Sequence, residues 1–255
     1  MNERLRPTLL LTSVLLAAAL PAQTALTAEQ VQAIAQRAYE KFGTKGLEIA
    51  VVQDGDVLAE VACGERGQGQ PMTPNTLCNI ASCSKAFTAA AIATLVQEGK
   101  LGWDDRVVDR VPEFKMADPW ITAHMTIADL LSHRCGLVTF AGDLLWYDSD
   151  YDEAEVLRRI EKLPIVQRFR DQFGYQNLMY MVAGIVVQRV SGESWEDYVT
   201  QHFFTPLGMT QSRTSAQRLP GDAERATPHI DGEPIRTTSS SPASPPRRST
   251  RHRTN

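Results

Sequence analysis

The stretch Asn79-Ile80-Ala81-Ser82-Cys83-Ser84-Lys85 leads into Ala86-Phe87-Thr88-Ala89-Ala90-Ala91-Ile92-Ala93-Thr94-Leu95-Val96, and Gly99 closes the run. The second segment is apolar at almost every position, which predicts a helix that begins at Ser82 and is buried on nearly every side. Ser82 and Lys85 are three residues apart and share one face of that helix. A lysine charge is costly among buried apolar side chains unless the residue has a function. Ser-x-x-Lys supplies one, because it places an amine within hydrogen-bond reach of a nucleophilic hydroxyl.

A second polar cluster precedes another apolar segment. Gly174-Tyr175-Gln176-Asn177 puts Tyr175 93 residues after Ser82 and directly before the apolar run 180–190, which predicts a second buried helix. At such a loop-to-helix junction a phenol can relay protons and an amide can orient a bound carbonyl. Tyr175 and Asn177 are therefore candidate site residues.

The other segments predict a mixed protein. Two β-rich runs around Asp54-Gly55 indicate a hairpin, and a polar loop is expected to follow it. Helical periodicity and its stop signals predict several further helices. The expected elements are a helix over 26–42 ended by Gly43, strands over 47–52 and 57–61, a loop over 64–74, a turn over 100–105, and helices over 127–131, 152–162 and 195–204.

The Ser-x-x-Lys box, the hairpin and the segment Tyr175-Gln176-Asn177, taken together, resemble those of the serine β-lactamase and penicillin-binding protein superfamily. The chain is most similar to the class C, esterase and D-aminopeptidase side, where Tyr-x-Asn replaces Ser-Asp-Asn. The resemblance covers about residues 47–236. It rests on the hairpin, the Ser-x-x-Lys box, Gly99-Lys100-Leu101 with Asp104-Asp105, Leu130-Leu131-Ser132-His133-Arg134-Cys135-Gly136-Leu137, Tyr175-Gln176-Asn177, Val190-Ser191-Gly192 and Pro206-Leu207-Gly208-Met209.

The resemblance implies a fold and a set of roles. The fold class is α/β (α+β), a β-lactamase/transpeptidase-like fold with a helical subdomain and an antiparallel sheet. Ser82 would accept the acyl group, and its backbone N–H would form half of the oxyanion hole. Lys85 would ease deprotonation of Ser82, and Tyr175 would act as general base and then as acid. Asn177 would bind Lys85 or the substrate amide, and no cofactor or metal is implied.

The chain departs from the family pattern at its third motif, a late Lys-Thr-Gly or His-x-Gly. No lysine follows Lys162, and none of the histidines His202, His229 and His252 has a glycine two residues later. We therefore expect the sheet to be incomplete and the chain to be a C-terminally truncated or frameshifted version of a longer enzyme. The alternative to an active hydrolase is a catalytically inactive remnant or pseudoenzyme of the same family.

Both ends of the chain have a distinct composition. Arg4 and Arg6 precede the apolar stretch 9–20 and small residues follow it, which predicts a signal peptide over 1–25 and export to the periplasm or medium. An uncleaved anchor or a buried helix is the alternative. The hydrolase domain is expected over 26–236. Residues 237–255, rich in Ser, Pro and Arg, predict a disordered tail.

Charge and cysteine content restrict the possible partners. The net charge of −4 gives no electrostatic footprint for nucleic acid. The resemblance implies a small molecule or a peptidoglycan-type peptide as the substrate. The oligomeric state stays open, as does the disulfide pairing among Cys63, Cys78, Cys83 and Cys135. His133 permits a Ser-His-Asp interpretation, but no Gly-x-Ser-x-Gly elbow accompanies it, and the resemblance makes it a loop-fixing residue.

Overall fold

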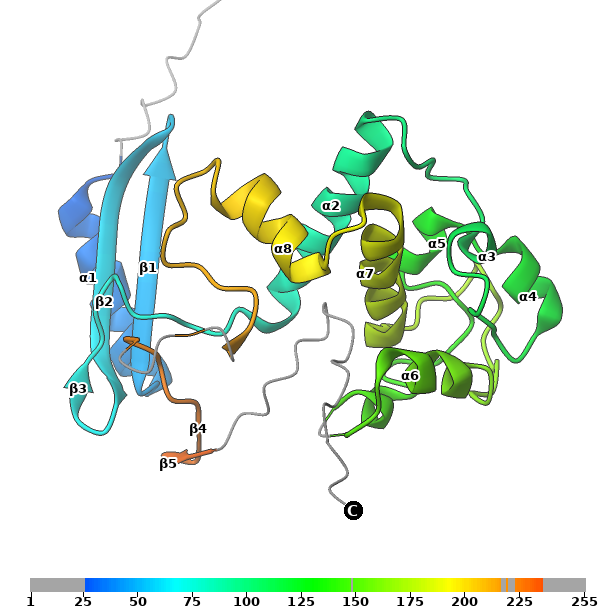
Figure 1. The fold of residues 1–255 in the computed structure, drawn as a ribbon. Helices are drawn as coiled ribbons and strands as arrows, with labels where there is room; N and C mark the ends of the chain where they lie inside the picture. The colour runs from blue at the N-terminus through cyan, green and yellow to red at the C-terminus, as the bar shows by residue number, and fades with distance from the viewer. Residues whose placement is uncertain (1–25, 148, 217–218, 220–222, 236–255) are drawn as a thin grey trace, which may run out of the picture.

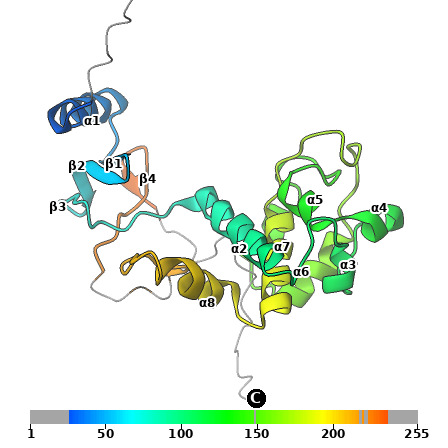
Figure 2. The ribbon, with the colours of Figure 1, turned by 90° about the horizontal axis from the view of Figure 1, so that it is seen from above.

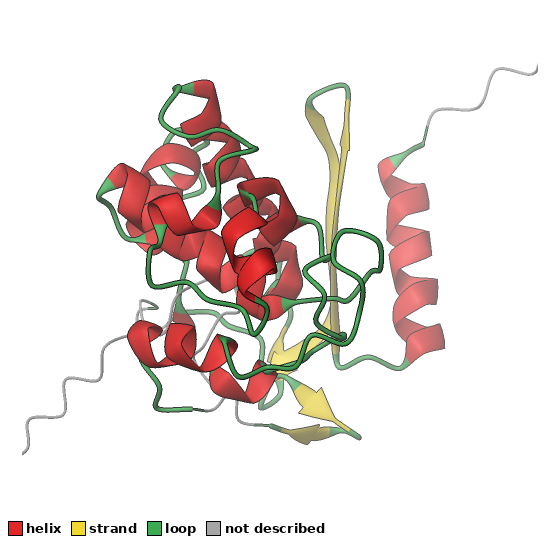
Figure 3. Cartoon of the chain, turned by 90° about the vertical axis from the view of Figure 1, so that its right-hand side faces the viewer, coloured by secondary structure: helices red, strands yellow, loops and turns green. Residues whose placement is uncertain are grey.

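The computed structural model describes residues 26–147, 149–216, 219 and 223–235. The predicted signal peptide and the predicted tail lie outside these residues. Figures 1 and 3 show a long β-hairpin with helix α1 on one side and the remaining helices on the other. The helices are α1 (Ala28–Phe42), α2 (Lys85–Gln97), α3 (Val107–Arg110), α4 (Pro119–His124), α5 (Ile127–Leu131), α6 (Glu153–Ile160), α7 (Asn177–Ser191) and α8 (Trp195–Val199). The strands are β1 (Gly46–Gln53), β2 (Asp56–Gly67), β3 (Gln70–Pro71), β4 (His229–Ile230) and β5 (Glu233–Pro234).

Helix α1 confirms the prediction for the first segment, with its start at Ala28. Thr27 and Gln30 form a capping box, in which each side chain accepts a hydrogen bond from the other residue's backbone N–H. Gly43 ends the helix in the left-handed conformation, which glycine adopts without steric cost. The buried Val31 and Ala35 belong to the cluster that α1 forms with the hairpin.

The hairpin is confirmed, but its second strand is longer than expected. Asp54 and Gly55 both have positive φ, 54° and 92°, as a two-residue hairpin turn requires. The prediction of a loop over 64–74 was wrong, since β2 continues to Gly67 and pairs with β3. Backbone pairing extends the strand here, since the Glu65 N–H donates to the Lys45 carbonyl (2.8 Å), and the side chains of the two residues form an ion pair. No alternation of apolar side chains signals this extension.

The helical part is built around α7. Almost every residue of α7 is buried, as predicted, and Gly192 ends the helix in the left-handed conformation. Helices α2 and α8 pack beside α7, and α2 reaches back toward the hairpin (Figure 2). Helix α2 is less completely buried than predicted. In the structure Lys85, Ile92 and Leu95 face inward, while Ala86 is exposed.

The remaining elements complete a mixed α/β fold of the predicted class. Helices α5 and α6 lie within the predicted ranges. The predicted helix over 195–204 is α8 followed by a π-helical turn, Thr200–Phe204. Strands β1, β2 and β3 form one antiparallel sheet, and β4 and β5 form a short ribbon that lies near β3 in Figure 1. No helix among the described residues is long and apolar enough to cross a bilayer.

Candidate active site

Ser82 lies on a tight turn ahead of α2. The α-helix itself begins at Lys85, and Ala81–Ser84 form a 3₁₀ turn instead of the first α-helical turn that the sequence predicted. Ala81 adopts φ 44°, and its backbone N–H donates to Asn79 Oδ1 (2.7 Å). This turn leaves Ser82 exposed, so its hydroxyl is accessible to an incoming molecule.

Lys85 is buried beneath Ser82, with 7% of its surface exposed. Its Nζ donates to Ser82 Oγ (3.2 Å) and to Asn177 Oδ1 (2.7 Å). It also lies 4.8 Å from the ring centroid of Tyr175 and 5.4 Å from that of Tyr180, within the range of cation–π attraction. A buried ammonium is costly unless it has partners of this kind, and here oxygen acceptors and ring faces supply them.

Tyr175 is the second side chain that contacts Ser82 Oγ. Its hydroxyl donates to Ser82 Oγ (2.7 Å), although the two residues are 93 positions apart. The backbone of the loop is fixed on both sides, since the Tyr175 N–H donates to Thr139 Oγ1 (3.1 Å) and the Phe140 N–H donates to the Tyr175 carbonyl (2.9 Å). Gly174 is needed at this point because a β-carbon there would collide with the Leu137 carbonyl.

Asn177 joins this group from the first turn of α7. It is 6% exposed, and its amide oxygen accepts the bond from Lys85. Its Nδ2 donates to Asp143 Oδ2 (2.9 Å), and Trp146 Nε1 donates to the other Asp143 oxygen (3.3 Å). The sequence analysis missed Asp143, because no motif or spacing ties this residue to Asn177.

His133 supports the loop of Tyr175. Its Nδ1 accepts a hydrogen bond from the Gln176 N–H (3.0 Å), and its ring stacks on Tyr175. Burial lowers the pKa of His133, and the nearby positive charge of Lys85 lowers it further. The hydrogen bond described for its ring goes to the backbone, not to Ser82.

Other groups contribute no recognisable metal or redox site within the described residues. No cluster of three or more His, Cys, Asp or Glu side chains among them has a metal-binding arrangement. All four cysteines are free thiols, with Cys63 and Cys135 buried and Cys78 and Cys83 exposed.

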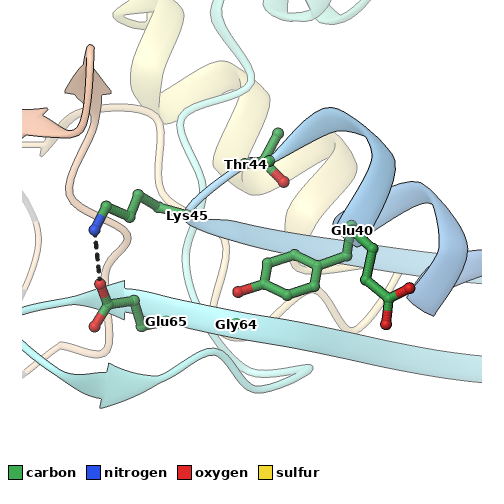
Figure 4. Close-up of a pocket in the computed structure, with 7 residues that line it drawn as sticks. Glu40, Thr44, Lys45, Gly64 and Glu65 are labelled. Atoms are coloured by element: carbon green, nitrogen blue, oxygen red, sulfur yellow. Dashed lines mark hydrogen bonds and ion pairs between the residues drawn. The ribbon is translucent and has the colours of Figure 1, made fainter.

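A surface pocket lies elsewhere, between α1 and the start of the hairpin (Figure 4). Lys45 points across it to Glu65, and the two side chains form an ion pair of 3.3 Å, while Glu40 points away. None of the four predicted site residues lines this pocket.

A comparison with protein-family models identifies the family of this chain. The model described as "Beta-lactamase" matches residues 31–250, which is most of the chain. The chain belongs to the beta-lactamase family. Penicillin-binding protein 4 of Amycolatopsis lactamdurans is 34% identical over 185 residues, 71% of this chain and 46% of the relative. Penicillin-binding protein 4* of Bacillus subtilis is 27% identical over 201 residues, 75% of this chain and 42% of the relative.

Solved structures of beta-lactamase-fold proteins match as well. The octameric penicillin-binding protein homologue from Pyrococcus abyssi superposes with a TM-score of 0.69 at 27% identity, covering 79% of this chain and 48% of that one. A class C beta-lactamase gives a TM-score of 0.72 at 21% identity, covering 86% and 59%, and shows the fold alone. The fold and the superfamily expected from the sequence are thereby confirmed. The chain spans less than half the length of the two curated relatives.

Proposed function

We propose that this member of the beta-lactamase family is an exported serine hydrolase that forms an acyl-enzyme at Ser82. One observation carries the proposal: Ser82 Oγ accepts hydrogen bonds from both Lys85 Nζ and the Tyr175 hydroxyl. An exposed serine oxygen that contacts both a lysine and a tyrosine hydroxyl has the neighbours that nucleophilic catalysis requires: a cation that stabilises the alkoxide, and a phenol that can take the serine proton once it is ionised.

The reaction follows from this arrangement. Ser82 Oγ attacks the carbonyl carbon of an ester or amide, and the proton of its hydroxyl passes to Tyr175, which acts as the base in its ionised form beside the positive charge of Lys85. The bond from the carbonyl carbon to the leaving oxygen or nitrogen then breaks, and Tyr175 returns a proton to the leaving group. A water molecule attacks the acyl-enzyme in the second half, releases the carboxylic acid and restores the Ser82 hydroxyl.

The substrate class is a β-lactam, a D-amino-acid peptide or a small ester. The names of the relatives favour a penicillin or a related cell-wall peptide, since two of them are penicillin-binding proteins. The predicted signal peptide would bring the chain to the compartment where such peptides occur. Mass spectrometry of the exported protein tests this step, because cleavage near residue 25 removes the first 25 residues from its mass.

Covalent labelling tests the nucleophile. The intact chain is incubated with a fluorophosphonate and, separately, with a fluorescent penicillin, and the modified peptide is identified by mass spectrometry. Ser82→Ala and Lys85→Ala should lose nearly all labelling. Ser84→Ala is the matched control, because it removes a hydroxyl from the same 3₁₀ turn and should keep it. Labelling that survives Ser82→Ala would place the nucleophile elsewhere. A folded chain that takes up neither probe would favour the alternative, a catalytically inactive member of the family.

A further inference from the structure

Asp143 contacts the site residue Asn177 but has no role in the acyl transfer proposed above. Its carboxylate contacts Asn177 Nδ2 with one oxygen and Trp146 Nε1 with the other. It lies 34 residues before Asn177 and reaches α7 from a separate loop. That loop comes close to α7 at Gly142, where a β-carbon would lie 2.5 Å from a methyl carbon of Leu178, the neighbour of Asn177.

The chemistry of the two partners fixes the orientation of the Asn177 amide. An ionised carboxylate accepts hydrogen bonds and donates none, so Asp143 can face only the NH₂ end of the amide. A lysine ammonium donates and accepts none, so Lys85 can face only the oxygen end. Asp143 and Lys85 therefore specify the same rotamer from opposite sides, and reversing the amide would leave both contacts unfavourable.

We propose that Asp143 is a positioning residue that sets the Asn177 amide and, through it, holds Lys85 Nζ against Ser82 Oγ. This inference rests on the proposed function, since it assigns Asp143 a role in activating the same serine. Asn177 Oδ1 lies 2.7 Å from Lys85 Nζ, and that nitrogen lies 3.2 Å from Ser82 Oγ. A chain of charge-assisted hydrogen bonds thus runs from Asp143 to the nucleophile.

The first test uses the orientation itself and needs no activity. The chain has five asparagines, so ¹⁵N-asparagine labelling gives five side-chain NH₂ signals, and Asn177→Ala identifies the relevant pair. In the wild-type chain the two Asn177 protons should be widely separated, because one of them donates to a carboxylate. Asp143→Ala should remove this separation and leave the other four pairs in place.

The second test measures activation of Ser82. A fluorophosphonate carries no amide, so its rate of reaction with Ser82 reports the serine and its neighbours without any contact between Asn177 and a substrate. Asp143→Ala should slow this reaction by about 10- to 100-fold, the loss typical when a group that orients a functional side chain is removed. The control Asp109→Ala removes the same side chain from an exposed ion pair with Arg106 and should react at the wild-type rate.

The outcomes separate the two proposals. If the wild-type chain is not labelled at Ser82 although the Asn177 signals respond to Asp143→Ala, the proposed function fails and the orientation by Asp143 stands. If Ser82 is labelled and Asp143→Ala, folded by circular dichroism, reacts as fast as wild type, the positioning role is overturned. Asn177 signals that do not respond to Asp143→Ala would overturn it as well.

Discussion

The rings of His133 and Tyr175 lie stacked, with centroids 4.4 Å apart and an interplanar angle of 27°. His133 accepts the Gln176 N–H through Nδ1, so it must be neutral there, and protonation would turn this acceptor into a donor facing another donor. Burial and the positive charge of Lys85 also lower the pKa of His133 in the folded state.

We predict that the hydrogen bond from the Gln176 N–H to neutral His133 makes the free energy of unfolding fall on mild acidification. As the pH drops below about 6.5, the unfolded chain binds a proton at His133 that the folded chain refuses, so the free energy of unfolding decreases until the lowered pKa is passed. His133→Asn should flatten the curve of thermal midpoint against pH. Asparagine keeps an acceptor, does not titrate, and tolerates the positive φ of 55° found here. Curves that remain parallel from pH 7 to pH 5 would rule out His133 as the titrating group.

Tyr175→Phe removes one hydroxyl and leaves the ring stacked on His133, so folding should be preserved. If the phenol carries protons to and from Ser82, kcat for a chromogenic ester should fall by about 10²–10⁴-fold, the usual contribution of a positioned acid or base. Tyr151→Phe serves as the control, since the ring of Tyr151 packs under the Arg159 guanidinium. A fall of less than about threefold would make Tyr175 a packing residue.

Phe140 forms an apolar edge beside the site. Its side chain is 58% exposed, and its ring meets Tyr175 edge-on with centroids 5.4 Å apart. Leu144, 80% exposed, extends the same loop. We predict a preference for substrates with an aromatic acyl group, and Phe140→Ala should raise KM for such an ester by about tenfold, the loss of one aromatic contact. KM for the corresponding acetyl ester should hardly change, and an equal rise for both esters would contradict the prediction.

The four predicted site residues were accessible from sequence because each belongs to a short motif with a chemical reason. Asp143 and Phe140 were not, since their roles depend on how a separate loop folds back onto α7 and Tyr175. A contact of this kind leaves no periodicity or spacing in the chain. The mutual contact of Ser82, Lys85, Tyr175 and Asn177 in the structure agrees with the proposed roles, which labelling and kinetics have to test.

The same distinction applies to the fold. Helices α1 and α7 were predicted because capping residues and long apolar patterns mark them locally. Helices α3 and α4, four and six residues long, were missed because such short helices have little stability of their own and depend on tertiary contacts. The end of β2 was missed for a related reason, because its pairing is carried by the backbone.

The last prediction concerns Asp129, whose fully buried carboxylate joins the two loops that lead to the site. It accepts hydrogen bonds from Arg134 and Arg170, and from Thr126 at the start of α5. Burial alone would raise the pKa of Asp129, but the hydrogen bonds from Arg170 and Thr126 outweigh it and hold the pKa below its usual value. Its stabilising contribution is therefore present above pH 4 and is lost as the pH falls through the lowered pKa.

Asp129→Asn should lower the free energy of unfolding at pH 7 by about 2 kcal/mol, less than for a fully buried pair because both arginines are about 40% exposed. Urea denaturation measures this loss, and the difference between variant and wild type should shrink at acid pH. Asp171→Asn breaks an exposed pair with Arg168 and should cost less than about 1 kcal/mol. Equal effects of the two substitutions would show that burial of Asp129 adds nothing to its interaction with the arginines.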